Sequence, residues 1–318
     1  MPKLLRAPAR VAISPVMDSR RWDSFEPRDG DIVIATYAKC GTTWTQRIVD
    51  LLVWQSPDIR PVGDISPWLD AAIFAPLEED LATLKAQTHR RYIKSHLPFD
   101  ALPVWDTVKY IHVARDGRDA RLSWQNHEKG FTPEFGKRFA ERAAELAAQG
   151  IAVPAGPPPQ RPDDPREYLL QWMDELEAAP PDNGAGYPTF FDFENSYWRE
   201  RGRDNLLLVH YDDLNADLER EMRRISDFLE IDTPASLMPT LVEAARFAAM
   251  KKDGDALVPI LKIAFDRGAD RFLNKGVSGR WRDALTDADA QRYDAIAHKR
   301  VGPELAAWLE GGRRGTGA

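Results

Sequence analysis

The chain has 318 residues, of which 43% are hydrophobic and 29% charged, a composition typical of a folded globular protein. Its 43 basic and 50 acidic side chains give a net charge of −7, so no general nucleic-acid partner is expected. The single cysteine excludes an internal disulfide framework and a multi-cysteine metal cage. There is no run of 18 apolar residues and no recognisable secretory signal, so we expect a cytoplasmic protein without a membrane partner.

The predicted elements alternate between strands and helices after an irregular, proline-rich lead-in over residues 1–30. Short apolar, β-branched runs predict buried strands over 31–37, 91–96, 109–115 and 205–211. Apolar residues at helical spacing predict helices over 42–54, 118–127 and from Asp212 or Asp213 to Leu229. Such alternation predicts an α/β fold of three layers, a central parallel sheet flanked by helices, in one domain over 31–318.

Two later segments interrupt this alternation. Residues 129–165 combine an amphipathic helix over 134–148 with six prolines from Pro154 to Pro165, which predicts a surface insertion or lid within the domain. Residues 262–282 hold six basic and two acidic side chains and are predicted to form a loop. This local excess of positive charge in an acidic chain indicates focused anion binding.

The sharpest motif, Thr36-Tyr-Ala-Lys-Cys-Gly-Thr-Thr-Trp44, lies between the first predicted strand and its helix. A helix N-terminus offers unpaired N–H groups, Gly41 allows close backbone approach, and Lys39 adds a positive charge, so the segment suits a phosphate. Thr42 and Thr43 add hydroxyl donors, although a turn in which they only cap the helix is the simpler alternative. Because the lysine precedes the glycine, the motif is not a Walker A loop, and a metal-dependent NTPase is disfavoured.

Two further segments carry groups that bind anions. Arg115 ends a predicted strand and Ser123 follows eight residues later, so a guanidinium and a hydroxyl can meet one phosphate. The later stretch Asn274-Lys-Gly-Val-Ser-Gly-Arg-Trp281 predicts a flexible cationic loop. Taken alone, the Arg115 segment is explained more simply by a surface ion pair, and the later stretch by a solvated loop. Three such segments together predict a ligand with more than one anionic group.

These motifs resemble those of the cytosolic-type sulfotransferases, which move a sulfonyl group from 3′-phosphoadenosine 5′-phosphosulfate (PAPS) to an acceptor. The family's phosphosulfate loop reads T-Y-P-K-S-G-T-T-W, its late loop reads R-K-G-x-x-G-x-W, and its 3′-phosphate segment has an Arg with a Ser eight residues later. Its motifs K-T-H-L-P and F-Y-E-D correspond to Lys94-Ser-His-Leu-Pro98 and His210-Tyr-Asp-Asp213. The resemblance covers residues 30–286 in the expected order and implies a P-loop-like fold.

In the phosphosulfate loop and the late loop, three positions depart from the family's motifs: Ala38 stands for Pro, Cys40 for Ser and Asn274 for Arg. We expect Cys40 to present its backbone N–H to the ligand while a strong hydroxyl donor is lost. Asn274 leaves more of the grip on the 3′-phosphate to Lys275 and the backbone.

The resemblance implies four catalytic residues. His96 is the general base for the acceptor, Lys94 stabilises the transferring sulfonyl oxygens, and Lys39 stabilises the leaving bridging oxygen. Ser123 contacts the 3′-phosphate and restrains Lys39. A lone histidine before Leu-Pro would otherwise be read as a structural histidine.

The resemblance also implies PAPS as the sulfonyl donor, 3′-phosphoadenosine 5′-phosphate (PAP) as the product, and no metal. Trp44, Tyr211 and Phe247 are expected to pack on adenine, with core packing as the plainer reading. The full set of implied donor-binding residues is Lys39, Cys40, Gly41, Thr42, Thr43, Trp44, Arg115, Ser123, Tyr211, Phe247, Asn274, Lys275 and Gly276.

The acceptor is expected to be a small molecule with a hydroxyl or amine, and a homodimer is compatible with the sequence. Residues 68–74 and 129–165 are expected to line or cover its pocket. Three alternatives stay open: a P-loop kinase-like enzyme, a non-catalytic phosphonucleotide-binding module, and a Golgi-type carbohydrate sulfotransferase, which would need an N-terminal anchor.

Overall fold

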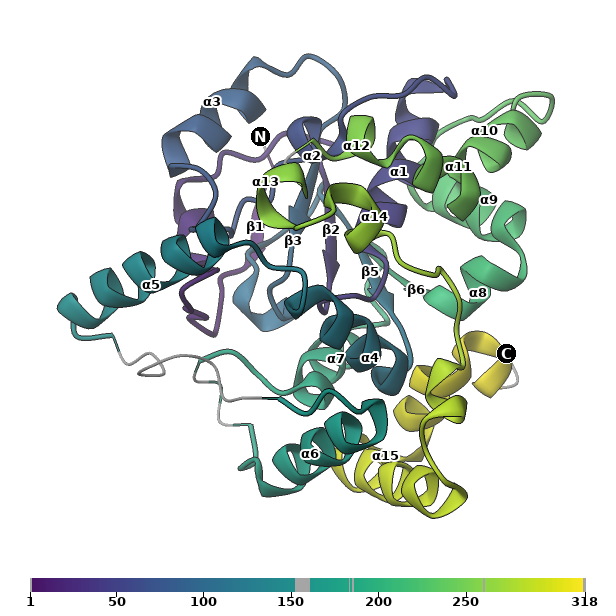
Figure 1. Ribbon diagram of the computed structural model, residues 1–318. Helices are drawn as coiled ribbons and strands as arrows, with labels where there is room; N and C mark the ends of the chain where they lie inside the picture. The colour runs from purple at the N-terminus through teal and green to yellow at the C-terminus, as the bar shows by residue number, and fades with distance from the viewer. Residues whose placement is uncertain (1, 152–160, 183, 185, 260, 317–318) are drawn as a thin grey trace.

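The computed structural model describes residues 2–151, 161–182, 184, 186–259 and 261–316. Its centre is a four-stranded sheet in the order β3-β2-β5-β6, and all three strand pairings are parallel (Figure 1). The strands are β2 (Ile32–Thr36), β3 (Tyr92–Ser95), β5 (Lys109–Ala114) and β6 (Leu206–His210). The predicted α/β class and the four predicted strands are confirmed.

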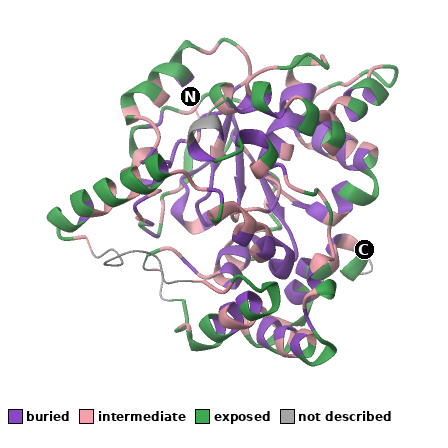
Figure 2. Cartoon of the chain, in the orientation of Figure 1, coloured by how far each residue is buried: buried purple, intermediate pink, exposed green. Residues whose placement is uncertain are grey.

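Helices cover both faces of the sheet, so its residues alternate between two apolar clusters. Ile32 and Ile34 of β2 pack in a cluster with helices α1 (Thr42–Trp54), α9 (Leu218–Phe228) and α10 (Met238–Ala245). Val33 and Ala35 belong to the cluster that includes helix α7 (Phe190–Trp198). Every residue of β2 is therefore buried, which explains its continuous run of apolar residues (Figure 2).

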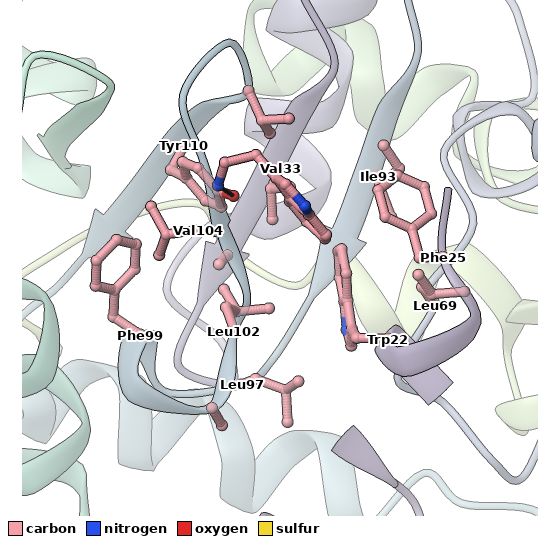
Figure 3. Close-up of a cluster of buried hydrophobic side chains, with 14 of the residues drawn as sticks. Trp22, Phe25, Val33, Leu69, Ile93, Leu97, Phe99, Leu102, Val104 and Tyr110 are labelled. Atoms are coloured by element: carbon pink, nitrogen blue, oxygen red, sulfur yellow. Dashed lines mark hydrogen bonds between the residues drawn. The ribbon is translucent and has the colours of Figure 1, made fainter. Parts of the chain in front are cut away.

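The lead-in, predicted to be irregular, closes the second of these clusters. It contains β1 (Leu4–Arg6), which pairs antiparallel with β4 (Val104–Trp105), and the 3₁₀ helix η1 (Ser19–Ser24). Trp22 and Phe25 are buried in the same cluster as Leu69 and Ile93 (Figure 3). Tertiary packing orders this proline-rich segment although it lacks any local periodicity.

Two predictions of local structure are wrong in detail. The single helix predicted to end at Leu229 is two helices, α8 (Tyr211–Ala216) and α9, because the Asp217 side chain accepts the Arg220 N–H and starts a new helix. The predicted loop over 262–282 contains α14 (Gly268–Phe272). It also contains part of α13 (Leu261–Ala264) and the 3₁₀ helix η3 (Arg280–Asp283). These elements are too short for sequence periodicity to reveal.

The remaining helices surround this core (Figure 1). They are α2 (Val62–Ile65), α3 (Leu77–Ala86), η2 (Phe99–Ala101), α4 (Gly117–Glu128), α5 (Pro133–Ala148), α6 (Pro165–Ala178), α11 (Phe247–Lys252), α12 (Gly254–Leu257) and α15 (Asp287–Thr316), which is interrupted at Gly302 and Gly312. The predicted amphipathic helix is α5, while residues 152–160 of the predicted lid lie outside the described residues. Within the described part of the chain, no helix has the length and apolar character needed to cross a membrane.

Candidate active site

A cleft of about 1920 Å³ opens where the parallel strands end. Residues directly after β2, β5 and β6 line it, as do Lys94 on β3 and His96 just beyond β3. The carboxyl ends of parallel strands are where open α/β sheets bind ligands. All but one of the predicted site residues line this cleft: Lys39, Gly41, Thr42, Thr43, Trp44, Lys94, His96, Arg115, Ser123, Tyr211, Phe247, Asn274, Lys275 and Gly276.

The turn between β2 and α1 is held in a shape that only a short list of residues can adopt. Lys39 and Gly41 both have positive φ angles, 69° and 107°. A Cβ at Gly41 would lie 3.0 Å from the Tyr211 ring, so glycine is needed for space as well as for conformation. No side chain of the described residues caps the N-terminus of α1, which leaves its first N–H groups at the cleft for an anion.

Cys40 is the predicted site residue that does not line the cleft. Its thiol is fully buried in an apolar cluster with Ala114 and Phe190, and this burial raises the pKa of the thiol well above its ordinary value. Its N–H donates to the Tyr37 carbonyl, at 3.3 Å, within the turn itself. In contrast to the prediction, the structure does not place Cys40 at the cleft. The residue fills the core behind the loop, where a small apolar group packs well.

His96 is set up as a proton acceptor. Its Nδ1 lies 2.8 Å from the Thr36 carbonyl oxygen, which can only accept, so Nδ1 carries the hydrogen and Nε2 keeps a free lone pair. Burial, helped by the nearby charge of Lys94, lowers the pKa of His96 to about 3. The imidazole is thus neutral at pH 7, the form that a general base requires.

A buried carboxylate supports this histidine from behind. Asp70 accepts hydrogen bonds from the His96 backbone N–H (3.0 Å) and from the indole N–H groups of Trp22 (3.2 Å) and Trp68 (2.7 Å). The Lys94 ammonium lies 4.2 Å above the Trp68 ring, and burial lowers its pKa to about 8 although Asp70 opposes the shift. Asp70 was not predicted; the available signal is one acidic residue within the apolar segment 68–74.

Lys39 contacts a second histidine. Its Nζ lies 3.2 Å from Nδ1 of His127 and 4.1 Å above the Phe272 ring. Burial, with repulsion from Arg115 and Lys94, lowers the pKa of Lys39 to about 7. Within the described chain no hydrogen bond joins Lys39 to Ser123; His127, one helical turn further along α4, occupies that place. Sequence reasoning missed His127, although its spacing of four from Ser123 places both on one face of the helix.

Arg115 ties the two anion-binding loops together. Its guanidinium donates to the carbonyl of Lys39 (3.2 Å) and to that of Val277 (2.8 Å), and it lies 4.1 Å from the centre of the Tyr211 ring. Its Nε is buried and has no hydrogen-bond partner among the residues that the structure describes. The surface ion pair considered for Arg115 is absent from the described residues, so this buried cation has donor capacity left for a ligand.

The late loop, residues 274–281, is fixed by a carboxylate on α4. The carboxylate of Asp119 accepts hydrogen bonds from the backbone N–H groups of Gly279 (2.5 Å) and Trp281 (3.4 Å). Gly276, with a φ of 66°, passes so close to the Phe247 ring that a Cβ there would lie 2.5 Å from it. The loop is thus a built wall of the cleft, in contrast to the solvated loop that its composition alone would suggest.

The wall of the cleft that α5 forms is apolar. One face of α5 turns a stripe of aromatic and small side chains toward it: Phe135, Gly136, Phe139, Ala140, Ala143, Ala144 and Ala147. Phe131 stacks on Phe135 at 4.2 Å, and Phe74 lies 6.1 Å from Phe135. The predictions that residues 68–74 and the described part of 129–165 border a pocket agree with this lining.

The geometry defines a class first: an α/β protein whose strand ends gather three cations and an uncapped helix around one cleft, beside a neutral imidazole. Comparison with known proteins identifies the family within this class. The sulfotransferase domain family matches residues 29–304. A glycolipid sulfotransferase of Mycobacterium tuberculosis is 36% identical over 306 residues, covering 94% of this chain and 93% of the relative. Sulfotransferase 1B1 of Mus musculus is 26% identical over 289 residues, covering 88% and 86%.

The chain belongs to the sulfotransferase family, and its reaction is sulfonyl transfer; the kinase-like and non-catalytic alternatives are not favoured. Solved structures share the fold. Mouse sulfotransferase SULT7A1 complexed with PAP has a TM-score of 0.62 at 21% identity, covering 88% of this chain and 86% of that one. Retinol dehydratase complexed with retinol and PAP has a TM-score of 0.60 at 21% identity, covering 88% and 83%.

Proposed function

We propose that this sulfotransferase uses PAPS as donor and an amphiphilic small molecule as acceptor, which it sulfonates on a hydroxyl or amine with His96 as general base. The observation that carries the proposal is the shared cleft. A neutral imidazole with a free Nε2 faces the same space as the glycine turn and the two lysines. Structural neighbours bind PAP, and a relative at 36% identity acts on glycolipids, which supports both halves of the proposal.

The residues present fit a doubly anionic adenine nucleotide. The uncapped start of α1 and Lys39 suit the phosphosulfate end. Arg115, with its unpartnered Nε, and Ser123 suit the 3′-phosphate, and the late loop adds Lys275. The Trp44 and Tyr211 rings, 5.2 Å apart, form an aromatic wall for the base together with Phe247.

PAPS supplies the sulfonyl group: the S–O bond to the 5′-phosphate breaks as an S–O bond to an acceptor hydroxyl, or an S–N bond to an acceptor amine, forms. The chain's own residues position the partners and place charge. The Nε2 of His96 accepts the acceptor's proton, while Nδ1 stays bonded to the Thr36 carbonyl and fixes the ring. Lys94 and Lys39 provide ammonium groups for the charge that develops on the sulfonyl and leaving oxygens. In-line transfer of this kind depends on positioning and electrostatics.

The apolar side of the cleft indicates the form of the acceptor. The stripe on α5 exposes aromatic and methyl groups to the cleft and contributes no charged side chain to its lining. A large apolar body gains free energy by covering such a surface, roughly 25 cal/mol per Å² removed from water. The reacting hydroxyl or amine then reaches the polar end at His96, as expected for an amphiphile.

The direct test is turnover with PAPS. We expect PAP release with a panel that contains phenols, steroid alcohols, amines and octyl glucoside, and release that is roughly 10²- to 10⁴-fold slower from His96→Ala. The expectation that no metal takes part is tested in the same assay, because activity should persist in excess EDTA. Nucleotide binding without turnover of any panel member would contradict the proposed function.

A further inference from the structure

His127 presents a second imidazole to the cleft, and it has a built environment. It lies on α4, four residues after Ser123, and its ring is surrounded by the rings of Phe265 (4.5 Å), Phe131 (5.1 Å) and Phe272 (5.6 Å). Trp124 on the same helix packs at 5.0 Å. Packing on this many sides restricts the ring to one orientation, so the direction of each ring nitrogen is set by the fold.

The hydrogen bond to Lys39 determines which nitrogen carries the proton. A bound anionic donor favours the charged form of Lys39, and an ammonium group can only donate, so Nδ1 of His127 then accepts from Lys39 and the hydrogen resides on Nε2. Burial, with the charges of Lys39 and Lys94 nearby, holds the pKa of His127 well below its ordinary value, so the ring stays neutral. Among the described residues, no hydrogen-bond partner is found for Nε2.

The two imidazoles of the cleft therefore have opposite tautomers. His96 bonds a carbonyl through Nδ1–H and offers Nε2 as an acceptor, whereas His127 bonds an ammonium through Nδ1 and offers Nε2–H as a donor. Both residues line the same cleft. A donor held among aromatic rings needs a hydrogen-bond partner, because a polar group without one is costly in apolar surroundings.

We propose that His127 is a specificity-determining residue whose Nε2–H donates a hydrogen bond to a second oxygen of the acceptor, beside the hydroxyl that His96 deprotonates. The inference rests on the proposed function and deepens it. The preferred acceptors are then polyols, such as 1,2-diols or sugars, rather than isolated alcohols. The Lys39 contact is what keeps His127 in the donor form.

The test compares 1-octanol with 1,2-octanediol as acceptors. In the wild-type protein, kcat/KM for the diol should exceed that for the alcohol by roughly 3- to 10-fold beyond the twofold statistical advantage of two hydroxyls, the worth of one hydrogen bond. His127→Gln places an amide N–H where Nε2–H stands and should keep this preference. His127→Asn retains an acceptor oxygen near the Nδ1 position but lacks the donor, so the ratio should fall to about two.

Three results would overturn the proposal. One is an unchanged preference in His127→Asn, and another is an equal loss in both variants, which would indicate a packing role. The third is a wild-type protein that shows no preference between 1-octanol and 1,2-octanediol, or that sulfonates neither of them while it sulfonates other panel acceptors. A wild-type protein that releases no PAP with any acceptor contradicts the proposed function itself, and that failure is distinct from a failure at His127.

Discussion

The two sides of the cleft are built on different principles. On the donor side, buried polar groups hold one another: Arg115 bonds two loops, Asp119 carries the late loop, and Lys39 meets His127. On the acceptor side, α5 turns a stripe of aromatic and methyl groups toward the same space. Polar networks tolerate few substitutions because each loss leaves a buried polar group without its hydrogen-bond partner, whereas apolar surfaces accept many shapes of similar volume. We therefore expect the donor side to be specific for one ligand, and the acceptor side for a type of ligand.

The largest effect should come from the residue where the two sides meet. His96→Ala removes the proton acceptor, so we expect kcat to fall roughly 10²- to 10⁴-fold, while PAP affinity measured by calorimetry changes little. A kcat close to that of the wild type would show that His96 is not the base.

Lys39→Met tests the donor side with a side chain of similar length. It removes a cation from the phosphosulfate loop, so both PAP affinity and turnover should drop, by roughly 10²-fold in kcat/KM. An unaltered nucleotide titration together with an unaltered rate would remove the assignment of this loop. Lys137→Met, an exposed lysine on α5 that does not line the cleft, is the matched control and should be silent.

The pH dependence of binding follows from the lowered pKa of Lys39. With a pKa of about 7 in the free protein, the amine loses its charge as pH rises through 7. PAP, with a phosphate monoester at each end, favours the charged form, so its affinity should decrease by about tenfold per pH unit between pH 7.5 and 8.5, with proton uptake on binding. Calorimetry in buffers of different ionisation enthalpy measures that uptake. Lys39→Met should abolish it, and a pH-independent wild-type affinity would contradict the prediction.

A charge placed on the apolar side should lower kcat/KM more for long acceptors than for short ones. Ala143→Glu puts a carboxylate into the α5 stripe, so kcat/KM for octyl glucoside should fall roughly tenfold, while that for a small phenol changes little. Ala148→Glu, exposed and outside the cleft lining, is the control. Equal losses for both acceptors would show that α5 does not contact the apolar body.

The smallest effect on activity is expected at Cys40. Cys40→Ser restores the residue of the family's loop, but the side chain points into the core, so rates should stay within about threefold of wild type. The buried hydroxyl lacks the apolar match of the thiol, which should cost about 1 kcal/mol and lower the melting temperature of a chain of this length by about 1–2 °C. A large gain in PAP affinity would instead mean that residue 40 faces the ligand.

The sequence by itself determined the local structure of the donor-side motifs. Strand, turn and helix around Lys39 are contiguous, so their order along the chain is their order in space, and Arg115 and Ser123 share a similar unit. The same holds for the parallel sheet, because alternating apolar strands and helices leave few other arrangements. Even here, the backbone N–H of Cys40, which the motif predicts to face the ligand, bonds the Tyr37 carbonyl, since a turn can present a group to either side.

Only the tertiary structure decided what surrounds these motifs. Lys39 and His127 are 88 residues apart and His96 and Asp70 are 26 apart, and neither pair shares a local pattern. The helices over 262–282 and the ordered lead-in around Trp22 form because apolar side chains distant in sequence cover one another. Long-range packing and the desolvation that comes with it set the tautomers and pKa values of the site, and no periodicity in the sequence encodes them.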